Sequence, residues 1–202
     1  MSDSGSFAGA SVMEGRDTGL RRTADSLMKE KRFRKAHEVY LHLANQGDPY
    51  AQLYVGWMNL EGVGVPRDKK LAYQWFTQAA SLGSAPAAFY CGRAALRDSE
   101  WAEAIRWFQH AIEKEYGPAL LWMGLIFIRG YGVPIDRAKG VAYLKRGAAT
   151  GNYYARGQLA LQMIRGSLGV KQIPSGLLLL VCSVAAAIAQ HIKEPRDERL
   201  LA

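Results

Sequence analysis

The sequence repeats itself at an interval of about 36 residues. Each copy opens on an alanine, and a glycine or a further alanine follows five positions later. The opening alanines are Ala51, Ala87, Ala119 and Ala155, and the second set is Gly56, Gly92, Gly124 and Ala160. Such self-similarity is typical of stacked arrays, because one copy is too small to close its own core and buries its apolar face against its neighbours. An array of this kind is first of all a surface for binding something.

Each copy is predicted to form two helices joined by a turn. Residues 50–60 are apolar at nearly every position, so this first helix must be covered on most sides. The stretch GVGVP at 62–66 interrupts it, because Gly reaches positive φ and Pro cannot continue a helix. Asp68 is a candidate N-cap for the second helix, which ends at Gly83, and Asp136 takes the same place in a later copy.

Small residues recur where the two helices of a copy are expected to cross. A second small column lies in the second helix, and a large side chain follows three positions later. The small residues are Ala72, Ala104 and Gly140, and the large ones are Trp75, Trp107 and Tyr143. Small residues let two helix backbones approach, and the aromatic side chain is expected to fill the space left where they diverge.

The chain is expected to hold one repeat domain between two tails. Residues 1–19 are rich in Ser and Gly and lack a basic region leading into an apolar run, so they are interpreted as a disordered tail and not as a signal peptide. The repeat domain covers 20–192, in units of about 20–47, 48–83, 84–115, 116–151 and 152–192, and 193–202 form a C-terminal tail.

Two copies resemble Sel1-like repeats, which are relatives of the tetratricopeptide repeats. The shared motifs are an A-x-x-x-x-G helix, a G-x-G-V-x-x-D loop and a closing A-A-x-x-G. One copy supplies Gly56, Gly62, Gly64, Val65, Asp68, Ala72, Trp75, Ala79, Ala80 and Gly83, and the other Gly124, Gly130, Gly132, Val133, Asp136, Tyr143, Ala148, Ala149 and Gly151. The resemblance implies an all-α fold, an α-solenoid of about five stacked antiparallel helix pairs in a right-handed superhelix. It also implies binding of proteins or peptides and no particular activity.

No catalytic, cofactor-binding or metal-binding residues are predicted. The glycines at 62–64 follow a helix and lack the Gly-Lys-Ser/Thr of a phosphate-binding loop. Ser26 and Lys29 have S-x-x-K spacing, but the other motifs of penicillin-recognising enzymes are missing. The four histidines form no i, i+4 pair, and neither Cys91 nor Cys182 has a partner at C-x-x-C spacing. Both thiols are expected to be buried, in a reducing compartment.

The resemblance to tetratricopeptide-like arrays implies that the first helices line a concave groove. Three arginines at one repeat position, Arg97, Arg129 and Arg165, are predicted to form a basic wall. The other predicted partner-binding residues are Trp57, Phe89, Arg93 and Leu125. With a formal net charge of +8 the chain suits an acidic protein or peptide. The alternative is that these arginines only cap helix C-termini, where cations are favourable without a ligand. Nucleic acid is not expected, because basic residues are spread out and aromatic side chains in the groove are few.

The C-terminal part of the domain carries no charged residue between 172 and 192. Its apolar run at 177–189 is shorter than the roughly 20 residues needed to cross a bilayer, so a packed final helix is expected. Leu179, Leu180, Ser183 and Val184 are expected to face the core. Leu177, Leu178, Val181 and Ala185 should then form an exposed patch, covered by a second copy in a homodimer, by another partner, or by the tail at 193–202.

Together these patterns favour a non-enzymatic protein-binding adaptor or scaffold, bacterial and cytoplasmic. The alternative is a membrane-tethered component of a bacterial envelope, polysaccharide or secretion system, anchored by residues 177–189.

Overall fold

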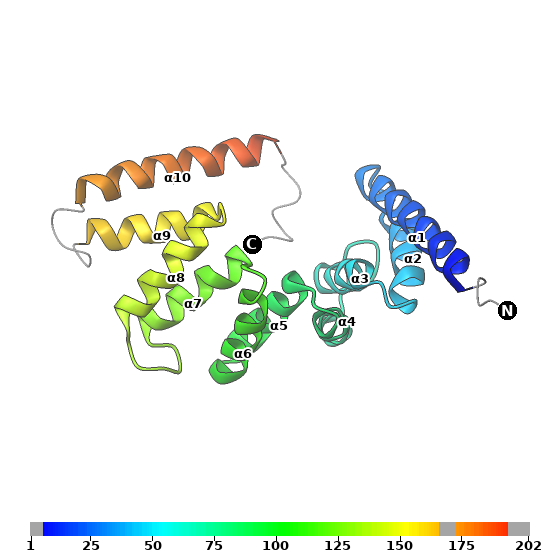
Figure 1. Ribbon diagram of the computed structural model, residues 1–202, viewed down its shortest axis with the longest axis horizontal. Helices are drawn as coiled ribbons and strands as arrows, with labels where there is room; N and C mark the ends of the chain where they lie inside the picture. Colours follow the sequence, from blue (N-terminus) through cyan, green and yellow to red (C-terminus); the bar gives the residue numbers. More distant parts are fainter. Residues whose placement is uncertain (1–5, 166–172, 194–202) are drawn as a thin grey trace. The chain divides into compact units, whose positions relative to one another are not determined.

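The structure, a computed structural model, describes residues 6–165 and 173–193. These residues form ten α-helices and no strand (Figure 1). The chain divides into two compact units, Met1–Ala87 and Ala88–Ala202. The architecture is the expected all-α solenoid of stacked helix pairs.

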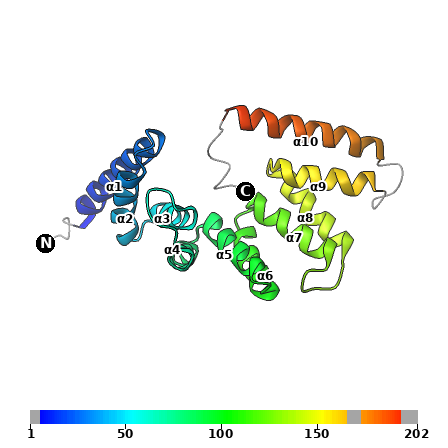
Figure 2. The same ribbon diagram turned by 180° about the vertical axis from the view of Figure 1, so that it is seen from behind.

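The first unit contains two helix pairs. They are α1 (Ser6–Lys29) with α2 (Phe33–Asn45), and α3 (Pro49–Glu61) with α4 (Lys69–Ser81). Helix α2 also packs against α3, so the second helix of one pair is covered by the first helix of the next. Figure 2 shows the same elements from behind.

The second unit contains three helix pairs. They are α5 (Ala85–Arg97, which begins at the end of the first unit) with α6 (Trp101–Ile112), α7 (Gly117–Arg129) with α8 (Arg137–Ala149), and α9 (Tyr153–Ile164) with α10 (Ile173–Lys193). Helix α6 packs against α7 and α8 against α9, which repeats the stacking of the first unit. Both views show α10 running alongside α9 (Figures 1 and 2).

Predicted caps set where the paired helices begin and end. The Asp68 carboxylate accepts a hydrogen bond from the Leu71 backbone N–H at the start of α4, and Asp136 accepts one from Lys139 at the start of α8. Both N-cap predictions are confirmed. Gly62 and Gly130 end α3 and α7 in the left-handed conformation, with φ of 72° and 74°. Because only glycine enters this region without a steric cost, the turn needs glycine there.

The helices of a pair cross at the expected small residues, but the large side chain at the crossing is a different one. A Cβ added to Gly56 would lie 2.7 Å from Cε1 of Phe76, and one added to Gly92 would lie 2.7 Å from Cε1 of Phe108. Leu144 takes the same place over Gly124. The filling residue is therefore four positions after the small residue of the second helix, whereas Trp75, Trp107 and Tyr143, three positions after it, are only half-buried. A step of four residues keeps a side chain on the same helix face more closely than a step of three.

A second glycine in each long loop packs against the preceding helix pair. Gly64 has φ of 74°, and a Cβ there would lie 2.7 Å from the backbone carbonyl carbon of Phe33 at the start of α2. Gly132 lies in the same way against Cβ of Trp101 at the start of α6. These loop glycines thus let one helix pair dock on the one before it.

Two expectations about the chain differ from the structure. Helix α1 begins at Ser6, whereas a disordered tail was expected over 1–19. Once a helix has formed over one stretch, its extension by further residues costs little free energy, because each added residue forms one more backbone hydrogen bond. Cys91 is buried as expected, but Cys182 is exposed, because it lies on the side of α10 away from α9. Among the described helices, none has the length and apolar character needed to cross a membrane.

Candidate functional site

The three arginines of the predicted basic wall lie at the C-terminal ends of the first helices in the second unit. Arg97 and Arg129 are in the last turns of α5 and α7, and Arg165 follows the last residue of α9. All three side chains are exposed. In the part of the chain that the structure describes, none of them forms an ion pair with a carboxylate. We call this set the arginine edge.

Arg129 is positioned by an aromatic stack. Its Nη1 donates a hydrogen bond to the Tyr131 hydroxyl at 3.2 Å, and its guanidinium lies 5.9 Å from the centre of the Tyr131 ring. The Tyr131 ring in turn stacks on Trp101, with centroids 5.1 Å apart and planes 14° apart. A guanidinium held over a ring keeps most of its N–H donors available for a second, acidic group. The sequence does not indicate this stack, because Tyr131 lies inside a turn in which the recurring residues are the glycines.

Arg93 extends this cationic surface next to two aromatic rings. Its guanidinium lies 5.9 Å from the centre of the Phe89 ring on its own helix and 5.8 Å from that of Trp122 on α7. Arg93 is exposed and Trp122 is half-buried, so both reach solvent. Trp122 was not among the predicted residues. An aromatic column two positions before the register glycine, formed by Tyr54, Tyr90 and Trp122, would have identified it.

The predicted apolar floor of the groove is largely core. Phe89 has no exposed surface, and its ring packs 5.9 Å from Phe108 and 5.5 Å from Tyr116. Leu125 is 9% exposed, and Trp57, in the first unit, is 7% exposed. These residues face the neighbouring helices, because a first helix is covered on most sides in a stacked array. They support the surface, and a partner can contact little of them directly.

Two buried polar atoms near these residues have no hydrogen-bond partner in the described structure. They are the Nε1 atom of Trp57 and the hydroxyl of Tyr116. Burial raises the pKa of Tyr116 to about 12, so its hydroxyl stays protonated at neutral pH. Among the described residues, neither atom has a hydrogen-bond donor or acceptor within reach.

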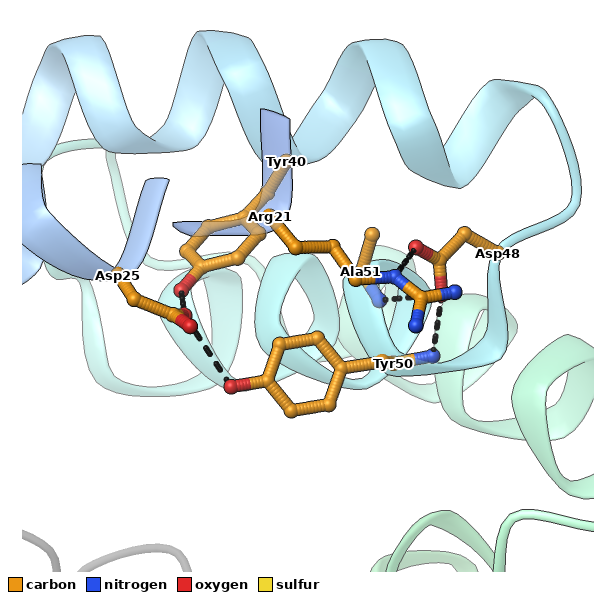
Figure 3. A network of polar contacts seen from close by, with 6 residues as sticks. All are labelled: Arg21, Asp25, Tyr40, Asp48, Tyr50 and Ala51. Carbon is orange, nitrogen blue, oxygen red and sulfur yellow. Dashed lines mark hydrogen bonds and ion pairs between the residues drawn. The ribbon is translucent and has the colours of Figure 1, made fainter. Parts of the chain in front are cut away.

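A polar network holds the three helices at the N-terminal end of the first unit together (Figure 3). The hydroxyls of Tyr40 and Tyr50 both donate to Oδ1 of Asp25, at 2.5 and 3.1 Å. Burial first, and the neighbouring Asp25 carboxylate second, raise the pKa of Tyr40 above its ordinary value. The pKa of Tyr50 is also raised, chiefly by burial. Both tyrosines therefore act as neutral hydrogen-bond donors that hold α2 and α3 to α1.

Asp48 forms the second half of this network. Its Oδ1 accepts hydrogen bonds from the backbone N–H groups of Tyr50 at 2.9 Å and Ala51 at 3.3 Å, which caps α3. Its other oxygen pairs with the Arg21 guanidinium from α1. The Arg21 side chain also lies over the Tyr50 ring, 5.9 Å from its centre. The network thus satisfies its own charges, and we assign it to structure.

The described residues hold no group of three or more His, Cys, Asp or Glu side chains that could bind a metal ion. Ser26 donates a hydrogen bond to Glu30 at 3.2 Å on the surface of α1. Burial lowers the pKa of His37, whose Nε2 is buried without a partner, so this ring is neutral at pH 7.

The C-terminal patch is placed largely as expected. Leu177, Leu178, Val181 and Ala185 are exposed on α10. Ser183 is buried and Leu179 and Leu180 are half-buried against α9. Val184 is exposed, although it was expected to face the core. It lies one residue past the buried Ser183, and that 100° step carries it off the face that contacts α9.

Known proteins share both the repeat and the fold. The model of the Sel1 repeat matches residues 49–84 and 117–152. The crystal structure of a Sel1 repeat protein from Oxalobacter formigenes is similar with a TM-score of 0.72 and 24% identity, over 82% of this chain and 68% of that one. The structure of c5321, a protective antigen present in uropathogenic Escherichia coli strains that displays an SLR fold, gives a TM-score of 0.75 and 20% identity, over 85% of this chain and 39% of that one. A search of curated proteins finds no match.

Proposed function

Because the chain is a Sel1-like repeat protein, we propose that it is a non-enzymatic scaffold that binds an acidic peptide or protein segment along the arginine edge. Sel1-like repeats are generally protein-interaction scaffolds and are typically not catalytic. The observation that carries the acidic partner is the set of three exposed arginines at one repeat position, none paired with a carboxylate in the described residues.

The geometry around the arginines suits a carboxylate ligand. Arg129 is held by its hydrogen bond to Tyr131, and the Arg93 guanidinium lies 5.9 and 5.8 Å from the centres of two rings. Both guanidinium groups therefore lose less side-chain entropy on binding than unconstrained ones would. A guanidinium offers five N–H donors in a planar fork, which matches the two oxygens of a carboxylate. The half-buried Trp122 ring adds apolar area beside Arg93 for a neighbouring side chain of the ligand.

Helix capping alone also explains why cations sit at helix ends. The two explanations differ in what removal of the charges does. If the arginines only complement the helix dipoles, replacing them lowers stability slightly and leaves binding unchanged. If they bind a partner, replacing them lowers affinity.

The test uses a fluorescent peptide in which Glu alternates with Leu, and the same peptide with Gln in place of Glu. Fluorescence anisotropy should show that the chain binds the Glu peptide more tightly and that binding weakens as salt rises. Each exposed charge contact contributes about 0.5 to 1 kcal/mol. Replacing Arg97, Arg129 and Arg165 together with Ala should therefore weaken binding by roughly 10- to 100-fold and flatten the salt dependence, with little change in thermal stability.

The matched control removes three exposed cations from the second helices, Arg106, Arg137 and Lys145, and so lowers the net charge equally. This control should keep most of the affinity. Equal binding of the Glu and Gln peptides, or equal losses in the two triple variants, would refute an acidic ligand on the arginine edge.

A further inference from the structure

The outer side of α10 is an apolar surface that no described element covers. Leu178 and Val181 are 67% and 66% exposed. Leu177, Val184 and Ile188 are also large apolar side chains in contact with solvent. Large apolar side chains gathered on one helix face normally mark an interaction surface, whereas single exposed ones need no explanation.

The opposite side of α10 is already used. A Cβ added to Gly176 would lie 2.8 Å from Cβ of Met163 and 3.0 Å from the Ala160 carbonyl oxygen, so α10 crosses α9 closely at this point. Ser183 is buried further along the same side. Gly176 follows Gly140 by 36 positions, so α10 is the second helix of a regular pair. The corresponding helices α2, α6 and α8 are covered by α3, α7 and α9, but α10 has no following helix in the described structure.

The exposed residues of α10 have the spacing of a helix-pairing seam. Leu178, Val181, Ala185 and Ile188 follow one another at steps of three, four and three residues. This is the heptad spacing with which two α-helices pack side by side. All four are exposed. A partner that is itself an apolar helix is therefore favoured over an extended peptide, whose side chains alternate with a period of two.

The charge distribution of the chain indicates which apolar helix packs on the outer face of α10. The chain has a formal net charge of +8, so two copies repel one another at most surfaces. From Ile173 to Ile192, α10 carries no Asp, Glu, Lys or Arg, so two copies of this helix can meet without burying an unpaired charge. We propose that the outer face of α10 is a dimer interface that takes α10 of a second copy in antiparallel orientation.

Packing favours the antiparallel arrangement. About a twofold axis at position 183, Leu178 lies opposite Ile188 of the second copy, and Val181 lies opposite Ala185. Each of the four resulting layers then contains at least one large side chain. A parallel pair would set Ala185 against Ala185 and leave a void, and interiors with voids lose contact energy. The opposed helix dipoles of an antiparallel pair are also favourable.

The size of the seam sets the expected affinity. The four seam residues extend over about three helical turns, or roughly 15 Å. A contact of this length falls at the small end of specific interfaces, below about 1,200 Å² in total. The dimer should therefore dissociate on dilution, with a dissociation constant on the order of micromolar. The mass has to be measured across that range of concentration.

Sedimentation equilibrium or light scattering of the full chain tests the interface. The mass should rise with concentration from 22.3 kDa toward twice that value. The variant with Leu178→Glu and Val181→Glu should stay at the monomer mass with unchanged circular dichroism. A control with Leu82→Glu and Ile135→Glu makes the same change at side chains that are 54% and 61% exposed elsewhere, and it should dimerise as wild type does. A dimer that survives the α10 variant overturns the proposal.

A crosslinking experiment on the wild-type chain tests whether the two copies meet at α10, without any folding risk. Cys182 is exposed next to the position of the proposed axis, and Cys91, the only other cysteine, is buried. A short bismaleimide should join two copies through Cys182, and Cys182→Ser should abolish the linked dimer. A dimer that forms no such link overturns pairing through α10.

Two further results would refute the dimer. A wild type that is monomeric at all concentrations and binds a hydrophobic dye has an open α10 face that prefers another partner. A monomer that binds no dye has this face covered by its own chain, for which the residues after 193 are available. The scaffold proposal depends on neither result, because the arginine edge lies on other helices.

Discussion

Glycine sets how closely the helices of a pair approach. A Cβ added at Gly56 would lie 2.7 Å from the ring of Phe76, and one added at Gly92 would lie 2.7 Å from the ring of Phe108, which is too close for either ring to stay in place. The pairing of a helix glycine with a large side chain from the next helix is therefore a steric requirement, and it recurs at Gly124 with Leu144. The recurrence of a small residue at this position of each repeat therefore reflects the recurrence of the same contact between the two helices of a pair.

Replacing Gly56 with Leu should destabilise the first unit. The added side chain enters a space that Phe76 already fills, and overpacking of a core typically costs about 1 to 3 kcal/mol. The control is Gln78→Leu on α4, which adds an apolar side chain at an exposed position and should be nearly neutral. Urea unfolding followed by circular dichroism measures both. Equal stability of the two variants would mean that the helix crossing lies elsewhere.

The starts of α3, α4, α8 and α9 are capped by short polar side chains, and one of these side chains does more than cap. Asp68 and Asp136 cap α4 and α8 through a backbone N–H at exposed positions. Asp48 caps α3 and is also buried against Arg21 of α1. The start of α3 is thus tied to the first helix of the array as well as to its own backbone.

Asp48→Ala should therefore cost more than Asp68→Ala. Loss of a cap costs about 1 kcal/mol. Loss of a hydrogen bond to a charged group adds about 1.5 to 3 kcal/mol, reduced here because Arg21 is partly exposed. Thermal unfolding of the single variants, and of Arg21→Ala with and without Asp48→Ala, measures the coupling between Arg21 and Asp48. Equal costs for Asp48→Ala and Asp68→Ala would show that the pairing contributes nothing.

At the scale of the whole molecule, the sequence predicts the helix pairs well and the exposed surface less well. Repeat spacing identifies Gly56, Ala72 and their equivalents because the same packing constraint acts in every pair. The burial of Phe89 does not follow from the repeat pattern. Aligned repeat positions predict which face of the helix a residue lies on, but they do not predict how much of that residue a neighbouring helix covers. A contact that occurs in one helix pair only, such as the hydrogen bond from Arg129 to Tyr131, produces no repeated pattern in the sequence and is visible only in the structure.

The central claim is that the arginine edge is the binding surface of this scaffold. Hydrogen exchange with mass spectrometry on the full chain, with and without the Glu-containing peptide, tests it most directly. Protein concentration is kept below the range in which α10 would pair. The account predicts slower exchange at the C-terminal ends of α5, α7 and α9 when the peptide is bound, and no change there with the Gln peptide. Protection confined to the second helices α6 and α8, or equal protection by both peptides, would contradict it.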